Sequence, residues 1–430
     1  MLSWVARSAG RFATVEAQAT RRDRVLPGRS SARAFGALVL LVAAGALAAC
    51  SAAAGDTHLG ATPRGAVGHA KGHDVRGDAQ SGAAAGASPA LTGKGRTSDK
   101  APAAFGVGLS VATWTESHGS TENFYEGTSQ RGRLMQVEIL YPTLDVKAPA
   151  VMPWAPPAYR YGPYPVIVFA HGFDVDPNTY RSLLVSWVEA GYVVVAPFFP
   201  DTSLAAIEAQ HGVDTESDMF NQPGDVAFVV SQVVGAAHGS PPPYAAYLTG
   251  LVDPAHLVLA GQSDGADTVA ALLYDHEYAR ARASMPVQPI AVALLSGAEW
   301  TRTEDVYSDP GRGGPPALVV QSLTDSCNDP ADSSQLYNIL TGAKWFLALE
   351  DATHLGPYVG GGAAAAAVKK VTAGFLDLEA GRGKVTTAIL GQEGDQPGVS
   401  TISSATSVPL YPAPPYVPGA CAAPAGAPTD

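Results

Sequence analysis

The sequence predicts an α/β fold built on a doubly wound, mostly parallel sheet with helices on both faces. Uniformly apolar runs such as Tyr164–Ala170 and Tyr192–Ala196 are typical of strands that are buried on both faces. Segments with helical spacing, such as Tyr180–Ala190 and Gly224–Ala237, alternate with these runs. Strands that alternate with helices form parallel sheets, so we expect this architecture.

The predicted elements begin with an antiparallel pair. Val107–Thr113 and Leu134–Leu140 have the composition of strands, the second alternates apolar and polar residues, and a Gly/Ser/Asn-rich turn region separates them. Pro142 stops the second strand. After the central strands and helices, four more strands are expected at Leu257–Ala260, Ile290–Leu295, Ala317–Gln321 and Trp345–Leu349. We expect one domain over residues 106–390.

The first 50 residues have the pattern of an export signal. Two arginines precede a short apolar run, Phe35–Ala49, that is too short to span a bilayer and resembles a signal-peptide core. Leu47-Ala48-Ala49-Cys50 resembles the lipobox of bacterial lipoproteins, which implies cleavage before Cys50 and attachment to the outer face of the cell membrane through its lipidated thiol. The alternative is an ordinary secretory signal with Cys50 incidental. Because the segment before the run is long, we also consider a translation start at Val25 instead of Met1.

Low-complexity segments flank the domain. Residues 51–105 are rich in Ala, Gly, Ser and scattered charge and are predicted to be a disordered tether, because they cannot bury enough surface to fold. Residues 391–430 are a Pro/Gly/Ser/Ala-rich tail that contains Cys421. If Cys50 is lipidated, Cys327 and Cys421 are the remaining thiols of an exported protein. We predict that they pair; two free thiols are the alternative.

Composition excludes several classes of partner. The formal net charge is −12, and seven arginines but only two acidic residues lie in the first 50 positions, so the remainder is more acidic still. This balance argues against nucleic acid as a partner. None of the three cysteines has metal-ligand spacing, and His69 and His73 lie in a polar linker. We therefore expect no metal and no cofactor, and a monomer.

The chain is organised around Gly261-Gln262-Ser263-Asp264-Gly265, which follows a predicted strand and precedes a predicted helix. Gly-x-Ser-x-Gly in this context is a nucleophile elbow, in which the serine is forced out at the carboxyl edge of the sheet. A glycine-rich turn with a capping serine is the alternative interpretation. A serine hydroxyl needs a base to take its proton and a carboxylate to orient that base.

The order Ser, acid, His expected for this architecture restricts the candidates. After Ser263 the histidines are His276, at the end of the elbow helix, and His354, just after the last predicted strand. We assign His354 as the base and His276 to solvent. The acid should follow the preceding strand, which selects Asp325. Candidates that we rank below it are Asp329 and, as a turn residue, Asp351.

An oxyanion hole needs two preorganised N–H donors. We expect them to be the amide of Asp264, after the nucleophile, and that of Phe173, in the His171-Gly172-Phe173 loop after the first buried strand. His171 is expected to order this loop instead of taking part in catalysis. Trp300 is a candidate for the substrate pocket, with core packing as the alternative.

Taken together, the elbow, the His-Gly-Phe loop, Gly191–Pro197, Asp325 and His354 resemble the serine α/β-hydrolases. The subgroup looks most similar to dienelactone hydrolase-like, chlorophyllase-like and platelet-activating-factor acetylhydrolase-like esterases and to cutinase-like polyester hydrolases. The resemblance implies the α/β-hydrolase fold and cleavage of a small-molecule ester through an acyl-serine. It departs from dienelactone hydrolase proper, which uses a Cys nucleophile, and Gln262 stands where many relatives have His. Rival functions are a non-catalytic envelope binding module, an acyltransferase or a peptidase.

Overall fold

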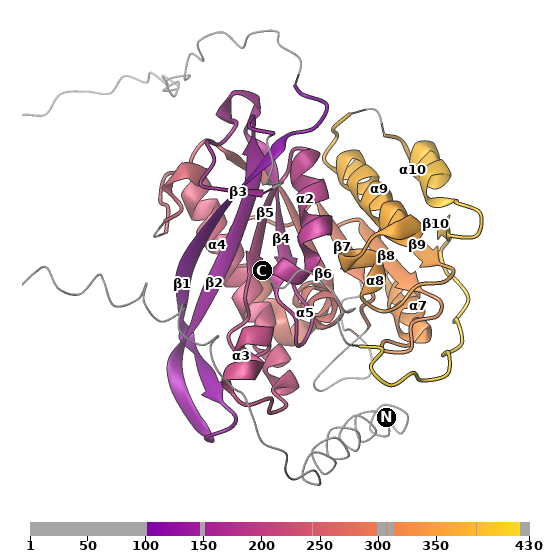
Figure 1. Ribbon diagram of the computed structural model, residues 1–430, viewed down its shortest axis with the longest axis horizontal. Helices are drawn as coiled ribbons and strands as arrows, with labels where there is room; N and C mark the ends of the chain where they lie inside the picture. The colour runs from indigo at the N-terminus through magenta and orange to yellow at the C-terminus, as the bar shows by residue number, and fades with distance from the viewer. Residues whose placement is uncertain are drawn as a thin grey trace, which may run out of the picture. The chain divides into compact units, whose positions relative to one another are not determined.

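A computed structural model describes residues 101–146, 151–242, 244–298, 307, 314–383 and 385–421 (Figure 1). These residues form a ten-stranded mixed sheet in the order β10-β9-β8-β7-β6-β4-β5-β2-β1-β3. Its centre consists of parallel strands: β5 (Val193–Pro197), β4 (Tyr164–Ala170), β6 (Val252–Gln262), β7 (Ala291–Leu295), β8 (Ala317–Ser322) and β9 (Lys344–Leu349). Parallel strands end at the same sheet edge, so the loops that follow them gather there.

Antiparallel strands and one short parallel strand extend the sheet on both sides of this parallel centre. β1 (Gly106–Asn123) and β2 (Thr128–Thr143) form a long antiparallel hairpin, and β2 pairs antiparallel with β5. The short strand β3 (Val151–Pro153) pairs with β1, and β10 (Ser400–Ser403) pairs antiparallel with β9.

Helices lie on both faces of the sheet (Figure 1). The α-helices are α2 (Arg181–Glu189), α3 (Leu204–Ala209), α4 (Gln222–Ala237), α5 (Asp264–Tyr274), α6 (Ala279–Ser284), α7 (Pro330–Ile339), α8 (Gly356–Val359), α9 (Gly362–Glu379) and α10 (Thr387–Gly394). Short 3-10 helices span Tyr159–Tyr161, Pro177–Tyr180, Glu216–Phe220, Ala246–Leu248 and His276–Tyr278. Among the described residues, none of these helices has the length and apolar character that a bilayer span requires.

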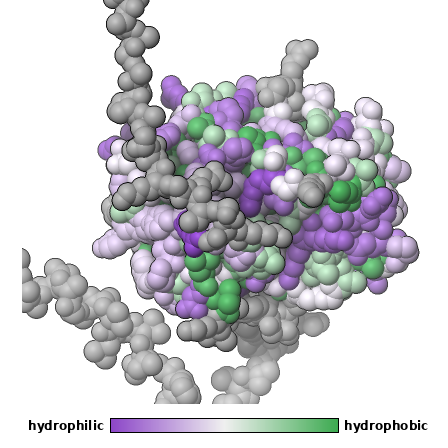
Figure 2. Space-filling model, turned by 90° about the horizontal axis from the view of Figure 1, so that it is seen from above, coloured by the Kyte–Doolittle hydropathy of each residue, from purple (hydrophilic) through white to green (hydrophobic). Residues whose placement is uncertain are grey.

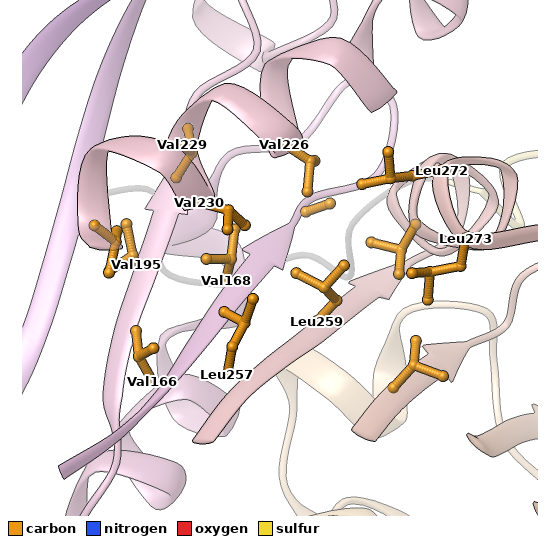
Figure 3. Packing of buried hydrophobic residues seen from close by; sticks show 14 of the residues in the cluster. Val166, Val168, Val195, Val226, Val229, Val230, Leu257, Leu259, Leu272 and Leu273 are labelled. Carbon is orange, nitrogen blue, oxygen red and sulfur yellow. The ribbon is translucent and has the colours of Figure 1, made fainter. Parts of the chain in front are cut away.

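Two apolar layers hold the helices on the sheet, because successive residues of a strand face opposite sides. Val166 and Val168 of β4 point into the layer covered by α4 and α5, and they belong to one buried cluster with Val226 and Val230 of α4 and Leu272 of α5 (Figure 3). Ile167 and Phe169 of the same strand point into the other layer, against side chains of α2 and α9. On the face seen in Figure 2, hydrophobic and hydrophilic residues are interspersed.

The predicted α/β fold is confirmed, and the central strands lie where the apolar runs place them. The hairpin is longer than predicted. Its turn lies at Phe124–Gly127, and β1 continues through a polar stretch because that stretch pairs along the ribbon with β2. The carboxyl boundary at residue 390 is also wrong, since Ser400–Ser403 completes the sheet beside β9 in the segment that we assigned to a tail.

Candidate active site

The elbow is a strained turn between β6 and α5. Ser263 has φ 54° and ψ −128°, a conformation that is costly for a residue with a side chain, and its N–H donates to the carbonyl of Leu295 at 2.9 Å. A Cβ added at Gly261 would lie 2.2 Å from the carbonyl oxygen of Gly265, and one at Gly265 would lie 2.1 Å from that of Ala170. Both glycines are therefore required by close backbone contacts, as the elbow motif predicts.

His354 and Asp325 meet at this sheet edge although 29 residues separate them. His354 Nδ1 lies 2.8 Å from Asp325 Oδ2, and both side chains are buried. The backbone N–H groups of Cys327 and Asn328 donate to Asp325 Oδ1, and the Gln321 side-chain amide donates to Oδ2. These donors fix the carboxylate beside the imidazole, the arrangement that a catalytic base needs.

His354 Nε2 contacts the residue next to the serine. The side-chain Nε2 of Gln262 lies 3.3 Å from it. Within the described residues, no hydrogen bond joins Ser263 Oγ to His354, so the Ser–His contact of an assembled triad is not made in this state. Catalytic hydrogen bonds are often long or unformed before substrate binds.

The other acidic residues and histidine have different environments. Asp329 caps α7 and accepts from the N–H of Ala331 at 2.9 Å, and Asp351 accepts from the hydroxyl of Thr324. His276 lies just after α5 with its side chain 56% exposed. The structure therefore pairs His354 with Asp325 and places each of the alternatives elsewhere.

The loop expected to supply an oxyanion donor lies against the elbow. A Cβ added at Gly172 would lie 3.1 Å from the Cβ of Ser263. Within the part of the chain that is described, the Phe173 N–H has no hydrogen-bond acceptor. Asp264 is the first residue of α5, where N–H groups have no intrahelical acceptor and the helix dipole is positive.

His171 holds this loop in place. The N–H of Phe199 donates to His171 Nε2 at 3.0 Å, so His171 Nδ1 carries the proton and donates to the Gly172 carbonyl at 2.7 Å. Burial lowers the pKa of His171 to about 4, because the charged imidazolium is disfavoured without water. Both nitrogens of this neutral ring make hydrogen bonds to the backbone, which fits the expectation that His171 orders the loop.

The remaining predicted residues fall into two groups. Cys50 and Trp300 lie outside the described residues. Cys327 and Cys421 are joined by a disulfide with an S–S distance of 2.07 Å. Because the Cys327 N–H donates to Asp325, this bond ties the C-terminal segment to the loop that carries the acid. Among the described residues, no cluster of His, Cys, Asp and Glu side chains is suited to hold a metal ion.

Sequence reasoning missed a buried charge cluster around Arg133 of β2. Its guanidinium donates to Asp225 of α4 and to Asp218, and it lies 3.6 Å from Asp201. The pKa of Asp201 is raised to about 7 by burial and by the neighbouring Asp218 carboxylate, and burial raises that of Asp225 to about 6. The only sequence signal is an arginine beside the alternating part of its strand; the partners lie 68 to 92 residues away.

The sheet order and the strained serine elbow are those of the α/β-hydrolase fold, and the buried His–Asp pair lies at the sheet edge where that elbow ends. Residues 120–291 of the chain match the family model described as Chlorophyllase. The predicted resemblance to chlorophyllase-like esterases is thereby confirmed.

A ferulic acid esterase from Streptomyces cinnamoneus matches in structure with a TM-score of 0.45 and 17% identity, covering 66% of this chain and 95% of that one. No curated protein has a significant sequence match to the chain. The family match supports an ester hydrolase.

Proposed function

We propose that the protein is a serine hydrolase that cleaves carboxylic esters through an acyl-serine intermediate, with Ser263 as nucleophile, His354 as base and Asp325 as acid. The observation that carries this proposal is the buried His354–Asp325 pair, 2.8 Å apart, whose second imidazole nitrogen, Nε2, faces the residue adjacent to the strained serine. A pair built in this way serves an activated nucleophile.

The proposed reaction has two stages. His354 Nε2 takes the proton of Ser263 Oγ while the oxygen attacks the ester carbonyl, and the N–H groups of Phe173 and Asp264 stabilise the oxyanion. The imidazolium returns the proton to the leaving alcohol, and the acyl group stays on Ser263. In the second stage His354 takes a proton from water while the water oxygen attacks the acyl carbon. The imidazolium then gives that proton to Ser263 Oγ as the acyl–oxygen bond breaks, so the acid product leaves and the serine hydroxyl is restored. Asp325 holds the Nδ1–H tautomer and stabilises the imidazolium throughout.

Hydrolysis of p-nitrophenyl acetate tests the proposal. Ser263→Ala should lower kcat/KM by at least about 10³-fold, because the nucleophile is lost. Ser231→Ala is the matched control: this hydroxyl donates to the Ala227 carbonyl within α4, away from the elbow, and its loss should leave the rate within about twofold. Equal rates in the wild type and Ser263→Ala would contradict the proposal. If Ser263→Ala abolishes the activity, a screen of esters over acyl chain length would identify the preferred substrate.

A further inference from the structure

Gln262 joins the oxyanion loop to the catalytic base through a chain of hydrogen bonds. The Gly172 N–H donates to the Tyr180 hydroxyl oxygen at 3.2 Å, and the Tyr180 O–H donates to Gln262 Oε1 at 2.6 Å. The other end of the Gln262 amide, Nε2, lies 3.3 Å from His354 Nε2. Gln262 and Tyr180 are fully buried, so water does not compete for these contacts.

The network fixes the direction of every hydrogen bond. The Tyr180 hydroxyl accepts a hydrogen bond from the Gly172 N–H and donates its own proton to the amide oxygen of Gln262, so the amide nitrogen faces the imidazole. Asp325 accepts three N–H bonds, so the proton between it and the imidazole belongs to His354 Nδ1. Because the Gln262 amide nitrogen, a donor, faces His354 Nε2, we assign the lone pair to Nε2 and the hydrogen bond as donated by the amide.

We propose that Gln262 is a positioning residue that holds His354 in the tautomer in which Nε2 can act as a base. The Ser263 hydroxyl then replaces the Gln262 amide as the donor to Nε2. This inference rests on the proposed function. The lone pair that accepts from Gln262 is the one that must accept the Ser263 proton. Once the imidazole is protonated, Nε2–H and the Gln262 amide are both donors, so the amide contact is lost as the proton moves to the leaving alcohol. Gln262 thus favours the neutral base over the imidazolium.

Other titratable groups near the imidazole act in fixed ways. Asp325, in direct contact, favours the imidazolium. Burial raises the pKa of both Tyr180 and Tyr358, so both stay neutral near pH 7. Asp264, at the start of α5, is an additional carboxylate on the elbow. Gln262 is the group in direct contact with His354 Nε2 that opposes protonation of this nitrogen. The effect of removing the Gln262 amide can therefore be measured.

The test compares Gln262→Met, which has a similar shape without a donor, with Gln262→Glu, which places an acceptor in the same position. The acidic limb of the pH profile of kcat/KM should move upward by about 0.5 to 1 pH unit in Gln262→Met, because one hydrogen bond to the neutral base is lost. In Gln262→Glu it should move by more than about 1 unit, because a carboxylate stabilises the imidazolium. Tyr180→Phe keeps the amide donor and should move the limb less than Gln262→Met.

A structural role alone would lower kcat/KM equally at all pH values, and an unmoved limb in both Gln262 variants would overturn the inference. Nitrogen NMR gives a readout that needs no activity and no folded variant of Gln262. At pH 8 the wild type should have a protonated Nδ1 and a bare Nε2 on His354, assigned by loss of the signals in His354→Gln. A protonated Nε2 would overturn the inference even if ester hydrolysis is confirmed. If the wild type hydrolyses no ester, the NMR result still shows whether Nε2 of His354 is free of a proton, as a hydrogen bond from the Gln262 amide requires.

Discussion

Gly265→Ala should separate the geometry of the elbow from its chemistry. The added Cβ would lie 2.1 Å from the Ala170 carbonyl oxygen, 2.5 Å from its carbon and 2.6 Å from the His171 oxygen, where ordinary contact begins near 3.4 Å. All three atoms are backbone, so α5 or the end of β4 must move by about 1 Å to relieve the overlap. Such overpacking costs about 1–3 kcal/mol of unfolding free energy. Because Ser263 moves relative to the Gly172 loop, turnover should fall by about 10²-fold.

Gly224→Ala is the matched control. Gly224 lies in the first turn of α4, as Gly265 lies in that of α5, but its added Cβ would meet no atom within 4 Å. Alanine should stabilise this helix by about 0.5–1 kcal/mol and leave turnover unchanged. Urea denaturation and p-nitrophenyl acetate hydrolysis measure both quantities. Equal stability and turnover in the two variants would refute the argument from close backbone contact.

Three other predictions concern stability. Arg133→Met should lower the free energy of unfolding in urea by about 3–5 kcal/mol, because it leaves buried aspartates without their cation. Arg131→Met, which removes an exposed guanidinium, should lower it by less than about 0.5 kcal/mol. Similar urea midpoints in the two variants would contradict the role of the cluster. Cys421→Ser should lower the stability by about 4 kcal/mol, because Cys327 and Cys421 are 94 residues apart and the bond restricts a long loop of the unfolded chain; alkylation of both thiols in the unreduced protein would show that the bond is absent. His171 has a pKa near 4 when folded against about 6.5 when unfolded, so the stability that it contributes above pH 6.5 should decline by about 3 kcal/mol as the pH falls to 4. The stability difference between wild type and His171→Gln isolates this effect from the buried aspartates, and a difference that does not vary with pH would contradict it.

The fold was predictable because its strongest signals are local. Runs such as Tyr164–Ala170 are apolar at every position since both faces of the central strands are buried, and the structure reproduces that strand's bounds. The elbow was predictable because close backbone packing requires glycine at positions 261 and 265. The positions of His354 and Asp325 followed from strand order, since both lie in loops after neighbouring parallel strands.

Features that depend on distant partners were not predictable. Nothing near Arg133 indicates that it is buried, because its carboxylates come from a loop and a helix 68 to 92 residues away. The outermost strand, Ser400–Ser403, is a short polar segment whose pairing depends on the exposed edge of β9 and not on its own composition. The sequence shows Gln262 only as a neighbour of the serine that stands where many relatives have His; its contact with His354 depends on Tyr180, which orients its amide.

The central claim is that a buried His–Asp pair activates the hydroxyl at position 263, and covalent labelling tests it most directly. The purified protein is treated with a fluorophosphonate, and the adduct is located by peptide mass mapping in the wild type and in His354→Ala. The account predicts a single adduct on Ser263 that forms at least about 10³-fold more slowly when the imidazole is missing. An adduct on another residue, or equal labelling rates in the two proteins, would contradict it.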